Sequence, residues 1–510
     1  EYTWEADGRI RNLDLRALGM ADTTMSGHFG LRSSGRMLPD DGIIDASVDI
    51  DSLFWSMSGT DLHTGPVKAL FASTDSSVSA TIDNAGLHAS FSSPQGLDSL
   101  MTHLAATGPM MTRQMADRRI DVEALQRTLP PMRLDMHASG PSLLADFLKG
   151  SGMSVNDIAL SAANDSLLSL NARALRIKSG DTRVDTVTAD IHQKSKFLIY
   201  NLAMGNRPGT MDEFANVRVR GYVADDKLAL LARQNNIQGK TGYKLGLTAS
   251  ADSTGINIKL TPYKPVIAYK DWTINSDNFI HLDIARRHFD ANLDMAGAGS
   301  RVRLYTEHSD SVATQEDVIL KITDLQLADW LAMSPFAPPV KGTVSSDMRF
   351  GWDESSLTGS GTVSLDDLVY GRERVGSFDL GVGLSTSAAG VIRADASLLV
   401  DSVKVITACG SLNDSTSATP FNLDFSMIHL PLRILNPFLP ADMARLSGML
   451  NGEMDITGDL AHPVFNGYID FDSTAVRVPM MGTDFRFSDN KVPVVDNVVT
   501  FDNYTIKAVN

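Results

Sequence analysis

Two histidine–aspartate repeats come nearest to a chemical site in this sequence. His281 and Asp283 are separated by one residue, and His288 and Asp290 repeat that spacing. On an extended strand each pair shares one face, as metal ligands or the members of a general-base dyad must. A metal also needs a third convergent ligand, and a dyad needs a nucleophile. Because the sequence places neither beside them, we expect ordinary strand and turn residues here and no metal site.

Other residues that could do chemistry are scattered. The patterns GxGxxG, GxxxxGK[ST], HExxH and GxSxG do not occur. The single cysteine, Cys409, follows Val405, Ile406 and Ala408, so we expect a small, buried apolar side chain. The sequence therefore predicts no catalytic residues, no cofactor and no enzymatic activity.

The composition argues against one class of binding partner, nucleic acids. The chain has 510 residues, a formal net charge of −16 and 43% apolar residues. Binding to nucleic-acid phosphates requires a basic footprint, so we expect no nucleic-acid partner. No apolar run reaches the length of about 18 residues that a membrane-spanning helix needs.

Strands with one apolar face dominate the pattern. Apolar residues alternate with polar or small residues over 44–50, 344–352, 378–384 and 465–471, and short turns such as 84–86 and 252–255 separate such runs. Short turns favour antiparallel meanders over parallel units. Alternation alone does not distinguish a closed sandwich from an open trough. Its continuation along the whole chain favours an open, quasi-one-dimensional stack.

Helical patterns are few and short. Residues 97–129 carry a broken amphipathic pattern with several methionines, and we expect Gly108-Pro109 to divide it into two helices that lie over the groove or its rim. Short helical turns are expected at 143–148, 228–231, 327–331 and 432–435. The last two precede the related stretches Ser334-Pro335-Phe336-Ala337-Pro338 and Asn436-Pro437-Phe438-Leu439-Pro440. These turns are expected to close repeat units.

The predicted fold is all-β with minor α: a long, antiparallel, repeating β-groove. We divide it into groove repeats with the helical insertion at 1–150, further repeats at 151–330, a repeat with the Pro-Phe-x-Pro element at 331–440, and a different C-terminal segment at 441–510.

The C-terminal segment resembles a known family. Residues 446–458 follow the pattern L-x-G-x-L-x-G-x-M-x-I-x-G, and His462-Pro463-Val464-Phe465, Val476-Arg477-Val478-Pro479 and the stretch 498–506 continue it. This stretch of sequence is similar to TamB, the translocation and assembly module subunit. TamB belongs to the AsmA-like group, and the similarity is greatest to its Bacteroidetes forms. The match covers about 60 residues, is looser over 330–440, and rests on pattern alone further upstream. Glycines at 448, 452 and 458 fit a curved sheet because they allow kinks and bulges.

The resemblance implies a location and partners. TamB-like proteins are held in the inner membrane by an N-terminal helix and cross the periplasm as a taco-shaped β-groove, similar to bridge-like lipid transfer proteins. They move phospholipid towards the outer membrane and assist protein insertion there with a barrel partner, TamA or BamA. We expect this chain to be a fragment without the anchor and without the part that meets the barrel partner. The family has no catalytic residues.

The expected partners are therefore phospholipid acyl chains. The expected groove lining consists of apolar residues on alternating strand positions: Val344, Met348, Phe350, Trp352, Phe378, Leu380, Val382, Leu384, Leu450, Met454, Ile456, Phe465, Ile469 and Phe471. Two other functions stay open: a scaffold or chaperone for outer-membrane protein insertion, and a structural or adhesive β-repeat protein.

Overall fold

The fold is described from a computed structural model. It describes residues 1–14, 16, 25–38, 42–57, 60–209, 212–252, 255–283, 288–308, 316–334, 337–352, 356–387, 389–413, 419–440, 442–459 and 461–509. The chain divides into two compact units, Glu1–Pro262 and Tyr263–Asn510, which are described separately. This division lies within the predicted segment 151–330.

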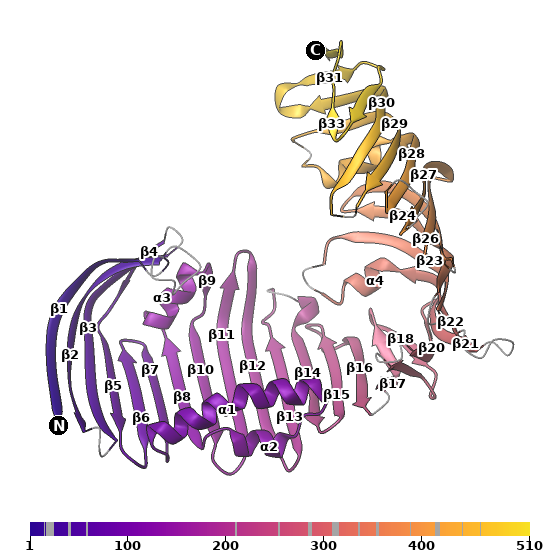
Figure 1. Ribbon diagram of the computed structural model, residues 1–510. Helices are drawn as coiled ribbons and strands as arrows, with labels where there is room; N and C mark the ends of the chain where they lie inside the picture. The colour runs from indigo at the N-terminus through magenta and orange to yellow at the C-terminus, as the bar shows by residue number, and fades with distance from the viewer. Residues whose placement is uncertain are drawn as a thin grey trace. The chain divides into compact units, whose positions relative to one another are not determined.

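Unit 1 is an antiparallel sheet with three α-helices (Figure 1). Its strands are β1 (Tyr2–Asp14), β2 (Met25–Leu38), β3 (Ile43–Met57), β4 (Thr60–Thr64), β5 (Val67–Ser73), β6 (Val78–Asn84), β7 (Leu87–Ser93), β8 (Met132–Ser139), β9 (Met153–Ser154), β10 (Asp157–Asn164), β11 (Leu168–Ser179), β12 (Thr182–Lys194), β13 (Phe197–Gly205), β14 (Asn216–Ala224), β15 (Lys227–Asn235) and β16 (Thr241–Ala251). Strand β17 (Ile256–Ile267) contains the boundary between the units. The helices are α1 (Leu97–Ala116), α2 (Val122–Thr128), α3 (Leu143–Gly150) and the 3-10 turn η2 (Asp212–Phe214).

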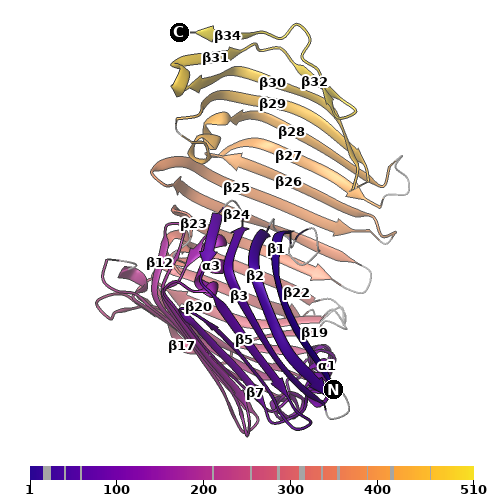
Figure 2. The same ribbon diagram turned by 90° about the vertical axis from the view of Figure 1, so that its left-hand side faces the viewer.

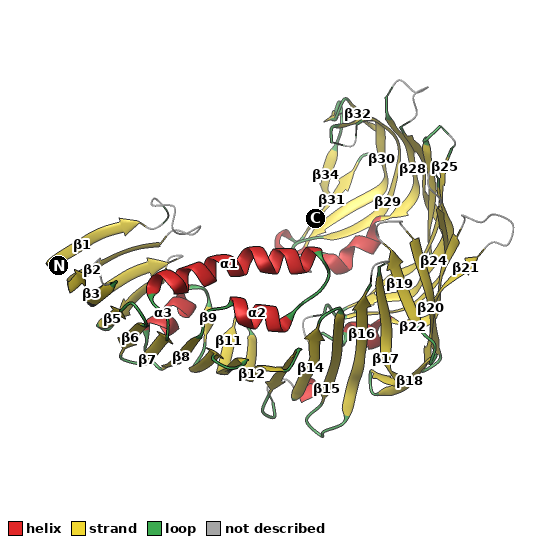
Figure 3. Ribbon diagram, turned by 60° about the horizontal axis from the view of Figure 1, so that its bottom comes forward, coloured by secondary structure: helices red, strands yellow, loops and turns green. Residues whose placement is uncertain are grey.

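Helices α1 and α2 form an insertion in a β-hairpin. Strands β7 and β8, which flank them in sequence, pair directly with each other. The helices lie along the strand ends between β7 and β15 (Figures 1 and 3). The side-chain amide of Asn164 on β10 donates to the carbonyl oxygens of Gln126, Leu129 and Pro130 at 2.8–3.1 Å, which fixes the end of α2 to the sheet.

The predicted break at Gly108-Pro109 is wrong. Helix α1 continues through Pro109 and ends at Ala116, and the chain turns before α2 begins at Val122. A proline inside a helix removes one i→i−4 hydrogen bond and crowds the carbonyl of residue i−4, and we attribute the continuity of α1 to its anchoring at both ends. Gly96 before α1 lies against the backbone of Asp75, and Ile120 after it forms a β-bridge with Asp225.

Three of the four predicted helical turns are present. Residues 143–148 lie in α3. Residues 327–331 form α4 (Leu327–Leu331) of unit 2, and 432–435 lie in its 3-10 helix η3 (Leu432–Phe438). The fourth prediction is wrong because Leu228, Ala229, Leu230 and Leu231 belong to β15, which is paired on both sides. A short apolar run is compatible with either a strand or a helix. Here hydrogen bonding to the neighbouring strands on both sides makes it a strand.

Unit 2 is also built of antiparallel strands, and its long strands are strongly bowed (Figure 2). Its strands are β18 (Lys270–Ile274), β19 (Phe279–Asp283), β20 (His288–Gly297), β21 (Ser300–His308), β22 (Glu316–Gln326), β23 (Val340–Trp352), β24 (Leu357–Tyr370), β25 (Glu373–Thr386), β26 (Ile392–Val400), β27 (Val403–Leu412), β28 (Phe421–Pro431), β29 (Arg445–Gly458), β30 (Pro463–Val478), β31 (Thr483–Phe487), β32 (Val492–Val495), β33 (Val498–Val499) and β34 (Ile506–Val509). Its helical elements are α4 (Leu327–Leu331) and the 3-10 turns η3 (Leu432–Phe438) and η4 (Pro479–Met481). Pro335 and Phe336 of the predicted repeat element lie outside the described residues.

The fold-class prediction is confirmed. The structure is 68% strand and 11% helix, its strands pair antiparallel, and its helices are few. Most strands pair with the next strand along the chain, as in a meander. A glycine marks one of the predicted bulges: Gly448 has φ +92° at the register shift between β29 and β30, where a Cβ atom would lie 2.5 Å from the Thr474 backbone.

Candidate functional site

The inner face of unit 2 carries an unbroken cross-strand row of apolar or small side chains. We define this face as the one bearing Trp272, whose ring meets Trp330 of α4 edge-on at 5.7 Å. Directly paired residues of neighbouring strands share a face. The row runs from β20 to β32 through Met295, Val302, Ile322, Ser346, Val363, Leu380, Leu398, Ile406, Met427, Gly452, Ile469 and Val492.

The register places all the predicted lining residues on this inner face. On β23, Val344, Met348, Phe350 and Trp352 share the face of Ser346. On β25, Phe378, Val382 and Leu384 share the face of Leu380. Leu450, Met454 and Ile456 on β29 pair with Phe471, Gly467 and Phe465 on β30, and Ile469 lies between them. The side chain of Trp352 lies outside the described part of the structure.

These inner side chains are not packed into a dry core. None of the predicted lining residues whose side chains are described is buried, and Leu380 and Phe465 are 38% and 37% exposed. In a closed sandwich the middle of an inner strand would be covered by the facing sheet. The inner face of unit 2 is therefore accessible at the predicted lining residues, whereas Met295, Ser346 and Val492 of the same row are buried.

Unit 1 has the same construction. Its inner face is the one against which α3 lies. One row runs from β1 to β16 through Ala6, Ser33, Val48, Ala69, Ile82, Ala89, Met136, Leu160, Ala172, Ala189, Leu202, Val219, Ala232 and Leu245. Ile82 and Leu202 in this row are 40% and 41% exposed.

An apolar cavity lies on the inner face of unit 1. Its volume is about 460 Å³, and Ser26 is the one hydroxyl-bearing residue among those that line it. Sequence reasoning missed this cavity because its walls come from strands far apart in sequence and from a short helix. The alternation in β3 and the apolar turn at 143–148 each indicate one wall of the cavity, but neither indicates that the two walls meet. The lining residues are Leu13, Ser26, Gly27, Phe29, Leu53, Trp55, Ile82, Leu87, Ala89, Met136, Leu143, Leu144 and Phe147.

A hydrogen-bonded chain fixes α3 over this cavity. The indole N–H of Trp55 donates to Thr64 Oγ1 at 3.1 Å, and that hydroxyl donates to Asp146 of α3 at 2.7 Å. The Trp55 ring also stacks on Phe147, with 6.0 Å between centroids. The backbone N–H of Leu143 at the start of the helix donates to Asn84 Oδ1 at 2.8 Å. The helix is thus held by polar bonds at its edges and contributes apolar side chains to the cavity.

Polar groups on the inner faces are sparse. Tyr200 donates its hydroxyl hydrogen to the carbonyl oxygen of Ala229 at 2.7 Å, and burial raises the pKa of this phenol. The ring reaches Ala229 across Gly221, where a Cβ atom would lie 2.5 Å from the tyrosine oxygen. In unit 2 the buried hydroxyl of Ser346 has no hydrogen-bond partner among the described residues.

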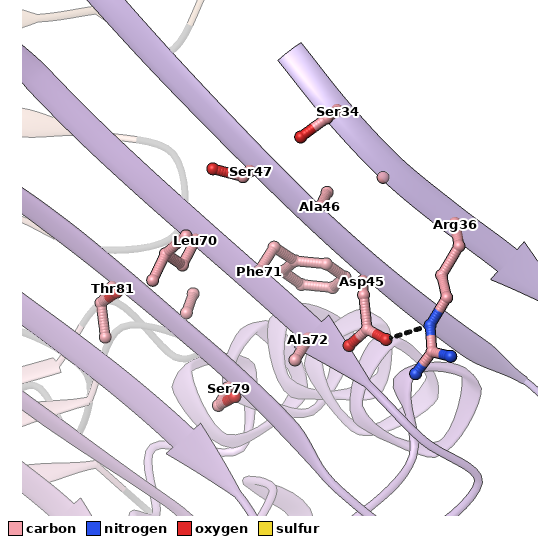
Figure 4. A pocket seen from close by; sticks show the side chains of 12 residues that line it. Ser34, Arg36, Asp45, Ala46, Ser47, Leu70, Phe71, Ala72, Ser79 and Thr81 are labelled. Carbon is pink, nitrogen blue, oxygen red and sulfur yellow. Dashed lines mark hydrogen bonds and ion pairs between the residues drawn. The ribbon is translucent and has the colours of Figure 1, made fainter. Parts of the chain in front are cut away.

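The opposite, outer faces are polar. A hollow of about 570 Å³ lies on the outer face of unit 1. Figure 4 shows Ser34, Ser47, Thr81 and Leu70 among the side chains that line it. The Arg36 guanidinium and the Asp45 carboxylate, 2.7 Å apart, form an ion pair at its edge. These residues suit solvation, and none of them forms a nucleophile–base pair.

The two His–Asp pairs come together on one face of a hairpin, where the ring centroids of His281 and His288 are 6.1 Å apart. His281 lies opposite Asp290, and Asp283 opposite His288, across the hairpin of β19 and β20. No group of three side chains suited to holding a metal occurs within the described ranges. The prediction that Cys409 is buried is wrong: it is exposed on the outer face, opposite Asp395 and Asp424. The strand alternation turns Ile406 and Ala408 inwards and Cys409 outwards.

No protein-family model and no curated protein sequence matches this chain. The described helices include none that is both long enough and apolar enough to cross a membrane.

Proposed function

We propose that this protein holds and conducts lipid acyl chains along the inner faces of its sheets, without catalysis. The observation that carries the proposal is that the inner rows are apolar and yet contain side chains that are exposed to solvent. The rows through Leu380 and Ile82 are apolar from strand to strand, yet both side chains remain more than a third exposed.

An acyl chain suits this surface energetically. Each methylene group that leaves water for an apolar surface gains about 0.8 kcal/mol. A charged residue in the row would interrupt that gain and would itself be desolvated at a cost. No charged side chain occurs in either row, and the cavity of about 460 Å³ is roughly three times the size of the ~150 Å³ apolar cavity that accepts benzene.

The resemblance of residues 446–506 to TamB-like proteins supports the same reading. On this resemblance we propose that the activity takes place in the periplasm, with phospholipid moving from the inner to the outer membrane. On the same resemblance, the proposed protein partner is an outer-membrane barrel protein such as TamA or BamA.

Lipid extraction after detergent-free purification tests the proposal. We expect mass spectrometry to detect phospholipid bound to the purified chain. A purified, folded chain without acyl lipid would contradict a lipid-holding groove and favour a structural or adhesive repeat protein.

Photo-crosslinking tests the position of the lipid. A photoreactive residue at position 82 or 380 should form acyl-chain adducts, because both positions are on inner faces. The neighbouring positions 81 and 379 face outwards and serve as matched controls. Equal labelling at inner and outer positions would contradict the assignment of the groove. Labelling of inner positions by unfolded outer-membrane barrel precursors instead would favour the assembly scaffold.

A further inference from the structure

The outer face of unit 1 carries a cross-strand row of charged residues. The row has alternating signs at one end of the sheet and only positive charges at the other. From β1 to β6 the paired residues alternate in sign through Asp7, Arg32, Asp49, Lys68 and Asp83, and His88 of β7 lies opposite Asp83. The Asp7–Arg32 and Asp83–His88 pairs lie within ion-pair distance, at 3.7 Å and 2.6 Å. Such opposite pairs stabilise neighbouring strands.

At β14 to β16 the same row becomes cationic. Arg218, Arg233 and Lys244 lie directly opposite one another on consecutive strands, and Arg220 follows Arg218 on the same face of β14. Like charges in directly opposite positions destabilise a sheet. This arrangement is unexpected in a chain whose net charge is −16.

The cations of this cluster are not neutralised by the protein. Within the described part of unit 1, Arg218, Arg220 and Lys244 form no ion pair. Arg233 donates to Asn235 Oδ1 at 3.1 Å and to Thr241 Oγ1 at 2.8 Å. Both acceptors are neutral, so they hold the guanidinium in place and leave its charge uncompensated.

A hollow lies beside the cluster. Its volume is about 730 Å³, and Arg218, Arg220 and Lys244 line it together with Asn201, Tyr222 and Thr248. Apolar residues, among them Ile199, Leu231 and Pro262, form the rest of its wall. Neighbouring strands are about 4.8 Å apart, so cations on consecutive strands can contact adjacent oxyanions of one ligand. Arginine is suited to this because its planar guanidinium binds phosphate through two parallel hydrogen bonds.

We infer that this hollow binds a small ligand that carries two or more phosphate groups. The positive charges are placed where the fold gains nothing from them, which is the pattern expected of binding residues. The inference concerns the outer face and does not depend on what occupies the inner groove.

Titration of the whole chain with inorganic pyrophosphate tests this inference. Isothermal calorimetry at low ionic strength should show saturable binding that weakens as salt is added. The double variant R218Q/K244Q, which changes two residues that line the hollow, should bind at least about tenfold more weakly, since each substitution removes a charge-assisted hydrogen-bond donor. Its midpoint of thermal unfolding should be unchanged or higher, because the variant relieves repulsion between opposite cations.

The matched control is R32Q/K68Q, which removes the same charge from the alternating half of the same face. It should bind pyrophosphate as the parent protein does. No binding by the parent, or an equal loss in both double variants, would overturn the inference. Flotation with phosphatidylglycerol vesicles distinguishes a free phosphate ligand from lipid headgroups. Binding to vesicles without binding to pyrophosphate would assign the cluster to a membrane surface and would also overturn the inference.

Discussion

Glu373 and Arg445 form a two-bond ion pair between the first residues of β25 and β29, although β26, β27 and β28 lie between these strands in the sheet. Arg445 Nη1 lies 2.6 Å from Glu373 Oε2, and Nη2 lies 2.5 Å from Oε1. Both strands extend past the β26–β27 turn, and η3 packs between their ends, where Phe438 meets Tyr370 at 5.0 Å. The pair therefore joins strand ends around a short helix and fixes the bend of this part of unit 2.

Arg445→Gln should lower the stability of unit 2 in a pH-dependent way. The Arg445 guanidinium lowers the pKa of Glu373 below its ordinary value of 4.5 through their hydrogen bonds. A carboxylate whose pKa is lowered in the folded state stabilises the fold above its unfolded pKa and loses that contribution as the pH falls through the folded value. Urea unfolding should show the variant less stable than the parent at pH 7 and equal to it at acid pH, below the folded pKa.

Arg374→Gln is the control for that comparison. Arg374 and Asp367 form an ion pair at 3.0 Å, but their side chains are 66% and 80% exposed, so solvent screens the interaction. We expect no measurable change at either pH. A pH-independent loss in Arg445→Gln would mean that the side chain acts through packing alone.

Leu380→Asp should reduce the lipid bound by the purified chain. The charge would interrupt the inner row of unit 2 at its centre, where acyl chains are proposed to lie. Because Leu380 is already 38% exposed, the loss of stability should be below the ~2–5 kcal/mol typical of a buried leucine. Lipid phosphorus per mole of protein and urea unfolding measure the two effects.

Asp379→Leu is the neighbouring control on the outer face. It removes a hydrogen bond of 2.6 Å between Ser364 and Asp379, at a cost of about 1 kcal/mol, and should leave the bound lipid unchanged. If Leu380→Asp retained the parent's lipid content, the lining would have been assigned to the wrong face.

Thr64→Val should destabilise unit 1 by about 1–3 kcal/mol. The substitution keeps the shape of the side chain but leaves the buried indole N–H of Trp55 and the carboxylate of Asp146 without their shared partner. Thr81→Val on the outer face of β6 should change stability by less than about 0.5 kcal/mol. Chemical denaturation followed by tryptophan fluorescence measures both, and equal effects would show that the chain from Trp55 to α3 contributes nothing.

Replacing residues 95–127 by a short glycine–serine linker should leave the sheet of unit 1 folded. The Ser93 hydroxyl donates to the carbonyl of Pro131 at 2.7 Å, so the ends of the insertion are close together. Leu129 and Pro130, which accept hydrogen bonds from Asn164, remain in this variant. Circular dichroism should lose helical signal only. Loss of the β signal would show that α1 and α2 are integral to the unit.

Strict alternation made much of the fold predictable. A strand such as 378–384 has one apolar and one polar face, so a shift of one residue would place Leu380 and Asp379 on the wrong sides. The same alternation, applied to β27, places Cys409 on the outer face. Apolar character of the preceding residues alone does not predict burial, because Ile406 and Ala408 face inwards while Cys409 faces outwards.

The cavity of unit 1 was beyond the reach of sequence reasoning. Its walls join Leu13, Trp55 and Met136 through pairing across several strands, and α3 closes it with Phe147. Local patterns specify each strand but not which strands face a helix. The course of α1 was mispredicted for a related reason, because contacts at its two ends keep residues on both sides of Pro109 in one helix.

The meander connectivity has a consequence for how the chain folds. Most strands pair with the strand that follows them, so most contacts join residues that are near in sequence, and the loops that must close are short. Within each unit, each new hairpin can add to an edge that is already formed, without waiting for distant segments. A polypeptide of this kind can acquire its structure in the order in which it is synthesised or exported, and shortening it from one end should remove strands one after another.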